Sequence, residues 1–496
     1  MRMRKLRDYE ERQPSDKNIP YRQPSGKKRK GSDRNREYTL VAGFFVMIFV
    51  AMVCYLIYFQ VMQSEEFINS PYNTRQDSFA DRVVRGRILS SDGQVLAESL
   101  DDWEGGTYRN YPYGNIFAHV VGYDSNGKSG LEAEANFLLL RSHEYFLDQI
   151  RNEASGVKNK GDDVVTSLDT SLQTTAYYAL GENRGAILAM EPKTGRILAM
   201  VSKPDFDPND IVYDWQYMVE DENDSRLLNR VTDGAYPPGS IFKMVTALDY
   251  YRRKGNFDGF TFWCNGEVSM DDYTIHCYGH SAHGEEDFTR AFANSCNCAF
   301  AQIGVQLGAQ SLRETAESLL FNKDLPFSSY RKSTFSLTKA SRISLVMQTA
   351  IGQGDTLVSP LHMAMITCAV ANNGVLMRPS LIDRVVTSDG QTVKTYEPSQ
   401  NTILMSRSEA KILQRLMEEV VTSGTALSLN WNGYTAAGKT GSAEYNEEGD
   451  SHSWFVGYCN TDDPDLVVAV IVEGGGAGSE SAVPIAGQIF DAYYYG

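Results

Sequence analysis

The amino-acid sequence predicts an α+β protein with one N-terminal transmembrane helix, a small membrane-proximal domain and a larger C-terminal domain. Three observations support this prediction. A chain of 496 residues is too long for one compact core. Residues 38–62 form one uncharged apolar run. Beyond residue 160, helical and strand-like periods of apolar residues alternate along the chain. We therefore divide the chain after residues 37, 62 and 160.

The first 62 residues predict a cytoplasmic tail followed by a membrane span. Residues 1–37 carry thirteen Lys or Arg against six Asp or Glu, a net charge of +7. Residues 38–62 contain no charged residue and are long enough to cross a hydrocarbon core of about 30 Å as a helix. A buried core helix is disfavoured because the run is apolar on every face.

The orientation of the span follows from the charges around it. The basic tail precedes the span and the acidic stretch QSEEF follows it, so the positive-inside rule places the N-terminus in the cytoplasm. The basic residues would then lie near the headgroups of the lipid bilayer. We expect a single-pass protein of the cell membrane, with residues 63–496 outside the cytoplasm.

Two domains are expected beyond the span. Residues 63–160 are polar and contain strand-like RVVRGRIL and GQVLAES around an SSDG turn, followed by one helix over residues 131–154. In residues 161–496, GAILAMEPKTGRILAMVS predicts a β-hairpin that turns at PKTG. The final segments SWFVGYCN, DLVVAVIVEG and AVPIAGQIFDAYYY predict a strand, a strand and a helix.

The stretch NGYTAAGKTGSAEY matches two incompatible patterns. Residues 433–440 fit the phosphate-binding P-loop, and Lys439-Thr440-Gly441 is a K-T-G triplet of serine acyltransferases. A P-loop needs an apolar strand before it and a helix beginning at Lys-Thr, and the polar flanking sequences provide neither. Nucleotides are also scarce outside a cell. We expect no nucleotide partner and a strand across YTAAGKTGSAE.

The charge of the external region argues against nucleic acid as a partner. The chain carries −16 in all and its first 37 residues +7, so residues 63–496 carry −23. Phosphate binding needs clustered Lys and Arg, and this region is acidic instead.

The cysteines predict a surface loop and core positions. Cys264 and Cys277 flank CNGEVSMDDYTIHC and could form a disulfide in an oxidising compartment. His276, His280 and His283 lie nearby, but their spacing matches no standard zinc pattern. We therefore expect a surface loop, no metal site and no cofactor. Four other cysteines in apolar surroundings are expected to be small core residues: Cys296, Cys298, Cys368 and Cys459.

A serine nucleophile with a nearby base is predicted at Ser240 and Lys243. Residues i and i+3 share a helix face, so Ser-x-x-Lys brings an amine close to a hydroxyl. Only at Ser240 does Pro-Pro-Gly precede an apolar helix that begins at the serine. Burial of Lys243 would lower its pKa towards that of a base. Six other occurrences are expected to be caps or surface positions, at Ser25, Ser125, Ser155, Ser329, Ser336 and Ser408.

Two further triplets complete a candidate site. Ser295-Cys296-Asn297 offers a second hydroxyl and an amide, although alone it fits an ordinary turn between helices. Lys439-Thr440-Gly441 offers a cation and a further hydroxyl. The three patterns follow in the order Ser-x-x-Lys, Ser-x-Asn and Lys-Thr-Gly, separated by 55 and then 142 positions. Together they indicate a serine acyltransferase.

Long motifs across residues 60–496 resemble the class B penicillin-binding proteins. The motifs are RGRILSSDGQVLAES, SLDTSLQ, GAILAMEPKTGRILAMVSKPDFDPN, NRVTDGAYPPGSIFK, SCN, AIGQGDTLVSPLHMA, ANNG and AAGKTGSAE. The short membrane-proximal region and GKSGLEAEANFLL most resemble the compact penicillin-binding protein A type. The resemblance implies a pedestal or dimerisation-type domain at residues 63–160. It also implies a β-lactamase-like transpeptidase domain at residues 161–496, with an antiparallel sheet flanked by helices.

The resemblance also implies a catalytic role for four residues. Ser240 would attack the carbonyl between the two terminal D-alanines of a peptidoglycan stem peptide, and Lys243 would take its proton. Ser295 would relay a proton to the departing amine. Lys439 would add a positive field.

Further residues would bind the substrate by the same resemblance. Asn297 would hydrogen-bond the peptide backbone and the side chain of Lys243. The hydroxyls of Thr440 and Ser442, on either side of Gly441, would hold the substrate carboxylate. The backbone N–H groups of Ser240 and Ser442 would form the oxyanion hole.

The expected activity is that of a D,D-transpeptidase that is acylated by β-lactams. A D,D-carboxypeptidase or membrane-bound β-lactamase would differ only in letting water deacylate Ser240. A non-catalytic β-lactam sensor or a scaffold for division or elongation is disfavoured by the complete set of site residues. The resemblance further implies a membrane glycan polymerase partner of the shape, elongation, division and sporulation family. A bifunctional enzyme is disfavoured because about one hundred residues are too few for a second catalytic domain.

Overall fold

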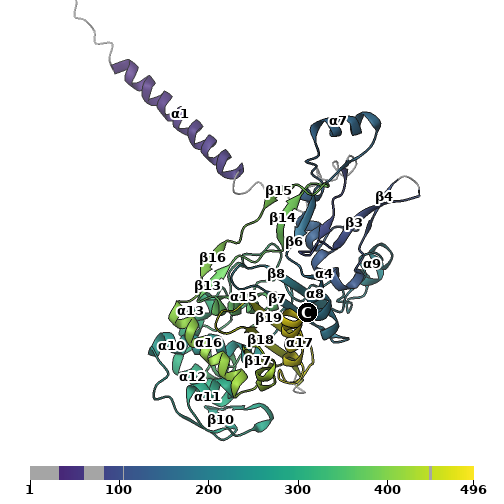
Figure 1. The fold of residues 1–496 in the computed structure, drawn as a ribbon. Coiled ribbons are helices and arrows are strands. Elements are labelled where there is room, and N and C mark those ends of the chain that lie inside the picture. The colour runs from purple at the N-terminus through teal and green to yellow at the C-terminus, as the bar shows by residue number, and fades with distance from the viewer. Residues whose placement is uncertain (1–32, 61–82, 104–105, 446–449) are drawn as a thin grey trace, which may run out of the picture. The chain divides into compact units, whose positions relative to one another are not determined.

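The computed structural model describes residues 33–60, 83–103, 106–445 and 450–496 (Figure 1). The chain divides into two compact units, residues 1–66 and residues 67–496, which are described separately. Helices and strands are both abundant in the second unit, which confirms the predicted α+β class. The predicted tail up to residue 32, and residues 61–82 of the predicted span and membrane-proximal domain, lie outside the described residues.

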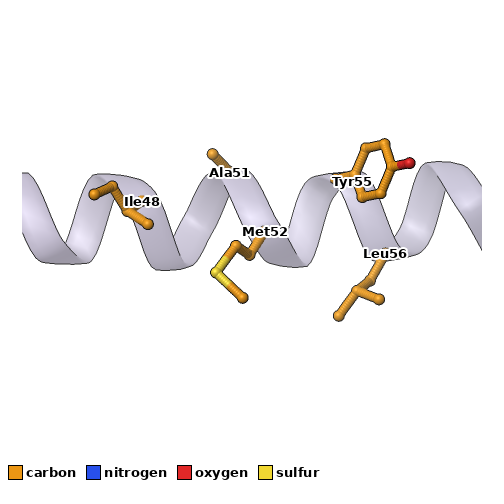
Figure 2. A pocket seen from close by; sticks show the side chains of 5 residues that line it. All are labelled: Ile48, Ala51, Met52, Tyr55 and Leu56. Atoms are coloured by element: carbon orange, nitrogen blue, oxygen red, sulfur yellow. The ribbon is translucent and has the colours of Figure 1, made fainter.

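The first unit contains helix α1 (Asp33–Tyr58), which begins before the predicted start at Tyr38. Its Tyr38–Tyr58 segment is long and apolar enough to cross a membrane, and its side chains are not buried against other parts of the chain. Five of these side chains line a shallow hollow on the helix surface, Ile48, Ala51, Met52, Tyr55 and Leu56 (Figure 2). Exposure of apolar side chains on every face is expected for a helix surrounded by lipid.

The core of the second unit is a five-stranded antiparallel sheet. Its strand order is β17 (Ala436–Glu444), β18 (Ser451–Cys459), β19 (Leu466–Val472), β7 (Gly185–Met190) and β8 (Ile197–Lys203). Strands β7 and β8 form the predicted hairpin, and β17, β18 and β19 confirm the three predicted C-terminal strands. Every residue of β19 is buried, so helices must cover both faces of the sheet.

Helices pack on this sheet from both sides (Figure 1). Helices α8 (Thr170–Leu180) and α17 (Ala482–Tyr495) contact each other and the sheet, and α17 confirms the predicted final helix. Helix α15 (Pro360–Ala371) is buried along its whole length against β7, β18 and β19. The other helices of this region are α9 (Ile211–Glu220), α10 (Lys243–Lys254), α11 (Phe288–Ala293), α12 (Asn297–Leu307), α13 (Ala309–Ser318), α14 (Ile343–Ala350) and α16 (Arg407–Thr422), with single turns η4 (Gly239–Phe242), η5 (Tyr278–His280) and η6 (Leu427–Trp431).

A second sheet contains strands from both predicted domains. Its order is β15 (Thr392–Thr395), β14 (Ile382–Val386), β6 (Asp163–Thr166), β2 (Ile88–Leu89), β3 (Val95–Asp101) and β4 (Thr107–Asn110). Strands β2 and β6 are parallel and the other neighbours are antiparallel. Two smaller ladders pair β1 (Val83–Val84) with β5 (Asn159–Lys160) and β13 (Val375–Met377) with β16 (Gln400–Ile403). The boundary at residue 160 stays a prediction, and this sheet spans it.

A buried ion-pair cluster organises the membrane-proximal part. The guanidinium groups of Arg85 and Arg109 donate to the two carboxylate oxygens of Glu132, at 2.6 and 2.7 Å. Glu132 is fully buried, and the two arginines hold the pKa of its carboxyl below the usual value although burial acts in the opposite direction. The ion pair between Arg85 and Glu132 therefore joins the RGRIL and GLEAEANFLL motifs of the sequence.

The predicted helix over residues 131–154 is wrong in its middle. The structure has three separate helices in this region, α5 (Gly130–Glu134), α6 (Asn136–Leu139) and α7 (Phe146–Ser155). They follow η3 (Gly114–Phe117) and α4 (Ala118–Val121). The chain leaves the helical path between residues 140 and 145. There the Arg141 carbonyl accepts from Asp162 N–H, and the carboxylate of Asp162 accepts from the backbone N–H of His143. Hydrogen bonds to Asp162, which lies between β5 and β6, thus replace those that would continue the helix.

The stretch from Cys264 to Cys277 differs from the predicted surface loop. It lies within two short antiparallel ladders, β9 (Phe262–Cys264) with β12 (Gly284–Glu286) and β10 (Glu267–Met270) with β11 (Tyr273–His276). Both cysteines are almost completely buried, with exposed fractions of 1% and 3%. Their sulfurs are 3.7 Å apart and are free thiols, so the possible disulfide is not formed in this structure.

Candidate active site

Ser240 lies at the junction between a Pro-Pro-Gly segment and a helix. The predicted helix start is a 3₁₀ turn, η4, which continues directly into α10 at Lys243. Fixed φ angles at Pro237 and Pro238 and the absence of their N–H groups suit the entry to a helix. The i, i+3 relation therefore places the Ser240 hydroxyl 3.1 Å from Lys243 Nζ.

The backbone before Ser240 is held from two directions. Tyr236 exchanges backbone hydrogen bonds with Val358, at 2.9 and 2.8 Å. On the other side, the indole N–H of Trp454 in β18 donates to the carbonyl of Pro237 at 3.1 Å. Because these contacts come from β18 and from the segment between α14 and α15, the position of Ser240 does not depend on its own helix alone.

Close backbone approaches bring η4 against strand β17. Gly239 has φ +54°, and a Cβ there would lie 2.7 Å from the carbonyl oxygen of Ser442. Gly352 has φ +84°, and a Cβ there would clash with the carbonyl oxygen of Gly239 at 1.8 Å. The Gly239 N–H in turn donates to the Gly352 carbonyl at 2.8 Å. Two glycines thus allow three chain segments to meet beside Ser240.

Lys243 connects the two predicted helix motifs. Its Nζ is fully buried and contacts the Ser295 carbonyl at 2.6 Å, the Ser295 hydroxyl at 3.2 Å and Asn297 Oδ1 at 2.7 Å. The ring of Phe300 lies 5.6 Å away. Burial lowers the pKa of Lys243 to about 8, so the amine is far more readily neutral than a lysine in water. A neutral amine next to a serine hydroxyl can accept its proton.

Lys439 reaches the same hydroxyl from the sheet. Its Nζ lies 2.9 Å from Ser295 Oγ and is fully buried, with the ring of Phe292 at 5.6 Å. Burial, and then the nearby charge of Lys243, lower the pKa of Lys439 well below its usual value. Ser295 therefore lies between two amines, which suits a hydroxyl that passes protons. Its own φ of +57° is in the left-handed region that few serines adopt.

The remaining predicted residues lie along β17. The hydroxyl of Thr440 is 2.6 Å from that of Thr425, which follows helix α16. Gly441 packs against η4, where a Cβ would lie 3.2 Å from the Pro238 carbonyl oxygen. The Ser442 hydroxyl accepts a hydrogen bond from Gly478 N–H at 3.3 Å. All the sequence-predicted site residues thus meet where η4, the Ser295 turn and β17 converge.

The strand assignment of the K-T-G segment also decides between its two patterns. Lys439 and Thr440 lie in the middle of β17, an edge strand that pairs with β18. A P-loop would require a helix to begin at these residues, because the helix N-terminus supplies the N–H groups for phosphate. Because residues 436–444 form a continuous strand, they cannot form the loop and helix start of a P-loop.

Three supporting residues were not predicted from the sequence. Glu473 accepts hydrogen bonds from the Tyr236 hydroxyl and from Arg230 Nε, both at 2.7 Å, just after β19. With the oxygen and nitrogen of its side-chain amide exchanged, Gln353 accepts a hydrogen bond from the Glu444 N–H at 3.0 Å and donates one to the Glu444 carbonyl at 3.3 Å. Glu444 is the last residue of β17. Thr425 holds Thr440. These contacts link residues far apart in sequence, and the motif spacing carries no signal for them.

Comparison with known proteins identifies two regions of the chain. Residues 185–491 match the family described as the penicillin binding protein transpeptidase domain. Residues 85–164 match the penicillin binding protein A dimerisation domain. The peptidoglycan D,D-transpeptidase PbpA of Mycolicibacterium smegmatis is 30% identical over 490 residues, which cover 91% of this chain and 97% of the relative.

Solved structures give the same result. The D,D-transpeptidase domain of a peptidoglycan glycosyltransferase from Eggerthella lenta is 30% identical, with a TM-score of 0.75 over 84% of this chain and 99% of that chain. Penicillin-binding protein A from M. tuberculosis, as an imipenem acyl-enzyme complex, is 27% identical, with a TM-score of 0.74 over 82% of this chain and 98% of that chain.

The lowered pKa of Lys243 predicts how acylation depends on pH. Above a pKa of about 8 the amine is neutral and can take the Ser240 proton, and below it the amine is protonated. The rate of acylation by a fluorescent penicillin should rise from pH 6, reach half its maximum near pH 8 and then level off. Melting temperatures over the same range would show that the fold persists. A rate that falls as the pH rises towards 8 would contradict the assignment of the base.

The close approach at Gly352 predicts a loss of acylation on adding one methyl group. Gly352→Ala would push the Gly239 carbonyl and with it Ser240, and a displacement of about 1 Å can cost about a hundredfold in rate. Gly255→Ala is the matched control, because Gly255 also follows a helix at φ +80° but has open space around its Cβ position. Penicillin acylation rates of both variants, with their melting temperatures, provide the measurement. Equal rates for the two variants would refute the steric argument.

Proposed function

This chain belongs to the penicillin-binding protein transpeptidase family, and from that premise we propose that Ser240 is the nucleophile of a peptidoglycan D,D-transpeptidase. The observation that carries the proposal is the buried amine of Lys243, which contacts Ser240, Ser295 and Asn297 at once. This contact set joins a nucleophile to a base and the base to a second hydroxyl, which is the arrangement that acyl transfer requires.

Acylation would proceed in two steps. Lys243 Nζ takes the proton of Ser240, whose Oγ bonds to the carbonyl carbon between the two terminal D-alanines of a stem peptide. The resulting oxyanion would accept hydrogen bonds from the N–H groups of Ser240 and Ser442, each worth about 3 kcal/mol of barrier. The tetrahedral intermediate then collapses and the C–N bond breaks. The departing amine of D-alanine gains a proton through Ser295, which lies between Lys243 and Lys439.

Substrate binding would use β17, the edge strand of the five-stranded sheet. The protonated form of Lys439 is favoured once a substrate carboxylate brings a negative charge beside it. The hydroxyls of Thr440 and Ser442 would hold that carboxylate, with Gly441 between them leaving room for the peptide. Asn297 would bond the peptide backbone through its amide.

Transfer to an amine completes the cross-link. An amine of a neighbouring stem peptide attacks the carbonyl carbon of the Ser240 ester, and its proton passes to Lys243. As the C–O bond to Ser240 breaks and the amide forms, Lys243 returns a proton to Ser240 Oγ. A β-lactam would form the same ester, and it would persist because the opened ring blocks the acceptor. A D,D-carboxypeptidase or a β-lactamase would use water in the second step. A non-catalytic sensor or scaffold is disfavoured because Ser240, Lys243, Ser295 and Lys439 form a chain of hydrogen-bonded groups.

The apolar helix, which is long enough to cross a membrane, supports a single-pass membrane protein. We place residues 1–37 in the cytoplasm, residues 38–62 in the lipid bilayer and residues 63–496 outside. Residues 63–160 would act as a pedestal or dimerisation-type domain and residues 161–496 as the transpeptidase domain. The basic tail and the acidic external region support this orientation.

Replacement of the nucleophile provides the main test. Ser240→Ala should abolish covalent labelling by a fluorescent penicillin, because Ser240 Oγ is the atom that forms the ester in the proposed mechanism. Ser408→Ala is the matched control, since Ser408 also begins a Ser-x-x-Lys pattern but is exposed on α16 and should keep full labelling. Labelling of intact cells with a membrane-impermeant penicillin tests the external location.

The same preparation separates transfer from hydrolysis. A peptide ending in D-Ala-D-Ala, incubated with an acceptor amine, should give the mass of the cross-linked product with wild type and none with Ser240→Ala. Undiminished labelling of Ser240→Ala would overturn the choice of nucleophile. A product that has only lost D-alanine would favour the carboxypeptidase.

A membrane glycan polymerase of the shape, elongation, division and sporulation family is the partner that we propose. Supporting it are the single apolar helix and a membrane-proximal region that matches a dimerisation domain rather than a second catalytic domain. Replacing residues 38–62 by an unrelated span should weaken co-purification with the polymerase at least about tenfold, while penicillin labelling stays unchanged. Co-purification that survives deletion of residues 38–160 would refute this partner interface.

A further inference from the structure

Four metal-binding side chains converge beside the Ser295 turn. They are Cys264 at the end of β9, Cys277 after β11, His283 before β12 and Cys296 at the start of α12. Their sulfur and nitrogen ligand atoms all lie within 4.8 Å of one another. The three cysteines are buried and the histidine is half-buried. A set of three thiols and one imidazole is a common donor set for structural zinc.

Three of the six distances between the ligand atoms are close to those of a tetrahedral metal site. Zinc bonds of about 2.3 Å to sulfur and 2.0 Å to nitrogen place two sulfurs about 3.8 Å apart and a sulfur and a nitrogen about 3.5 Å apart. The Cys264 and Cys277 sulfurs are 3.7 Å apart, and those of Cys277 and Cys296 are 3.8 Å apart. Cys264 Sγ lies 3.4 Å from His283 Nδ1. A disulfide would require about 2.05 Å.

The surrounding backbone favours anionic sulfur. The Gly266 N–H points at Cys264 Sγ at 3.4 Å, and the Ala299 N–H points at Cys296 Sγ at 3.4 Å. Cys296 is also the N-cap of α12, where the helix dipole stabilises a thiolate. The zinc ligand is the thiolate, so these donors prepare two of the sulfurs for a cation.

We infer that Cys264, Cys277, His283 and Cys296 bind one zinc ion, and that this ion fixes the Ser295–Asn297 turn for acylation. The sequence predicted no metal because the spacing around His276, His280 and His283 matches no standard zinc pattern, and it predicted Cys296 as a core residue. The four ligands are 13, 6 and 13 positions apart. The fold brings them together from two short ladders and a helix start. Such small ladders have little core of their own, and a metal would join them to α12.

The ion would act on the site through its neighbours. Cys296 lies between Ser295, with its left-handed φ, and Asn297, and both of these residues bond Lys243. The Asn297 amide also donates to the carbonyl of His276 at 3.0 Å, and His276 directly precedes the ligand Cys277. One ion would therefore fix the backbone on both sides of the Asn297 side chain. The metal site does not depend on the proposed function, whereas its effect on acylation rests on it.

Zinc content tests the site without reference to activity. The full-length protein, purified in detergent with a thiol reductant and zinc sulfate, should contain one zinc ion per chain by elemental mass spectrometry. Cys264→Ser should lose it. Two matched variants, Cys368→Ser in the buried part of α15 and Cys459→Ser at the buried end of β18, should keep it. Replacement by Co²⁺ should give the charge-transfer and visible bands of tetrahedral thiolate coordination.

Two results would overturn the site. One is wild-type protein without zinc. The other is a mass loss of two daltons in a peptide pair containing Cys264 and Cys277, which would indicate a disulfide in place of the metal. Retention of zinc by Cys264→Ser would overturn the ligand set.

Chelation and restoration test the effect on catalysis, and they avoid a variant that fails to fold. Removal of zinc from wild type should slow penicillin acylation at least about tenfold, and added zinc sulfate should restore it. An unchanged rate in zinc-free protein would overturn the effect on acylation. Ser240→Ala should keep its zinc and lose labelling. Wild type that binds zinc but is never labelled would instead refute the proposed function and leave the metal site intact.

Discussion

The site depends on the burial of one amine. Lys243 Nζ is removed from water, and its bonded partners are neutral hydroxyl, carbonyl and amide oxygens. Burying an amine costs free energy unless its hydrogen bonds are made, and burial without a carboxylate partner favours the neutral form. The same constraint therefore fixes the Ser295–Asn297 turn next to α10 and lowers the pKa of Lys243, which suits the base of the proposed mechanism.

The nucleophile is positioned by packing of backbone against backbone. Gly239 approaches the Ser442 carbonyl, and Gly352 approaches Gly239. Contacts of this kind tolerate less adjustment than contacts between flexible side chains, because neither partner can rotate away. The indole of Trp454 and the carboxylate of Glu473 brace the same segment from the sheet side. The Ser240 hydroxyl thus belongs to a helix, but its location is set by β17, β18 and the loop after α14.

The sequence predicted what is local and missed what is distant. The Ser240 and Lys243 pair follows from helix geometry, and the strand across the K-T-G triplet follows from the lack of a helix after it. The contact of Thr425 with Thr440 depends on how α16 docks on the sheet, which no local period encodes. The helix over residues 131–154 failed for a related reason, since hydrogen bonds to Asp162 replace helical ones in its middle. Apolar periodicity cannot anticipate that competition.

The Ser295 turn needs support from outside itself. A left-handed φ at a serine costs about 1 kcal/mol or more, and surrounding contacts must offset that cost. Lys243 bonds the turn from one side and Lys439 bonds the Ser295 hydroxyl from another. In the proposed mechanism both lysines take part in proton transfer, so the strength of these two contacts would vary during the reaction. The thiol of Cys296 points to the third side, away from the reacting groups, towards Cys277. A zinc ion bound to Cys296 would fix the Ser295–Asn297 turn while Lys243 and Lys439 change protonation in the proposed mechanism. The buried cysteines would in this way support the proposed catalytic residues.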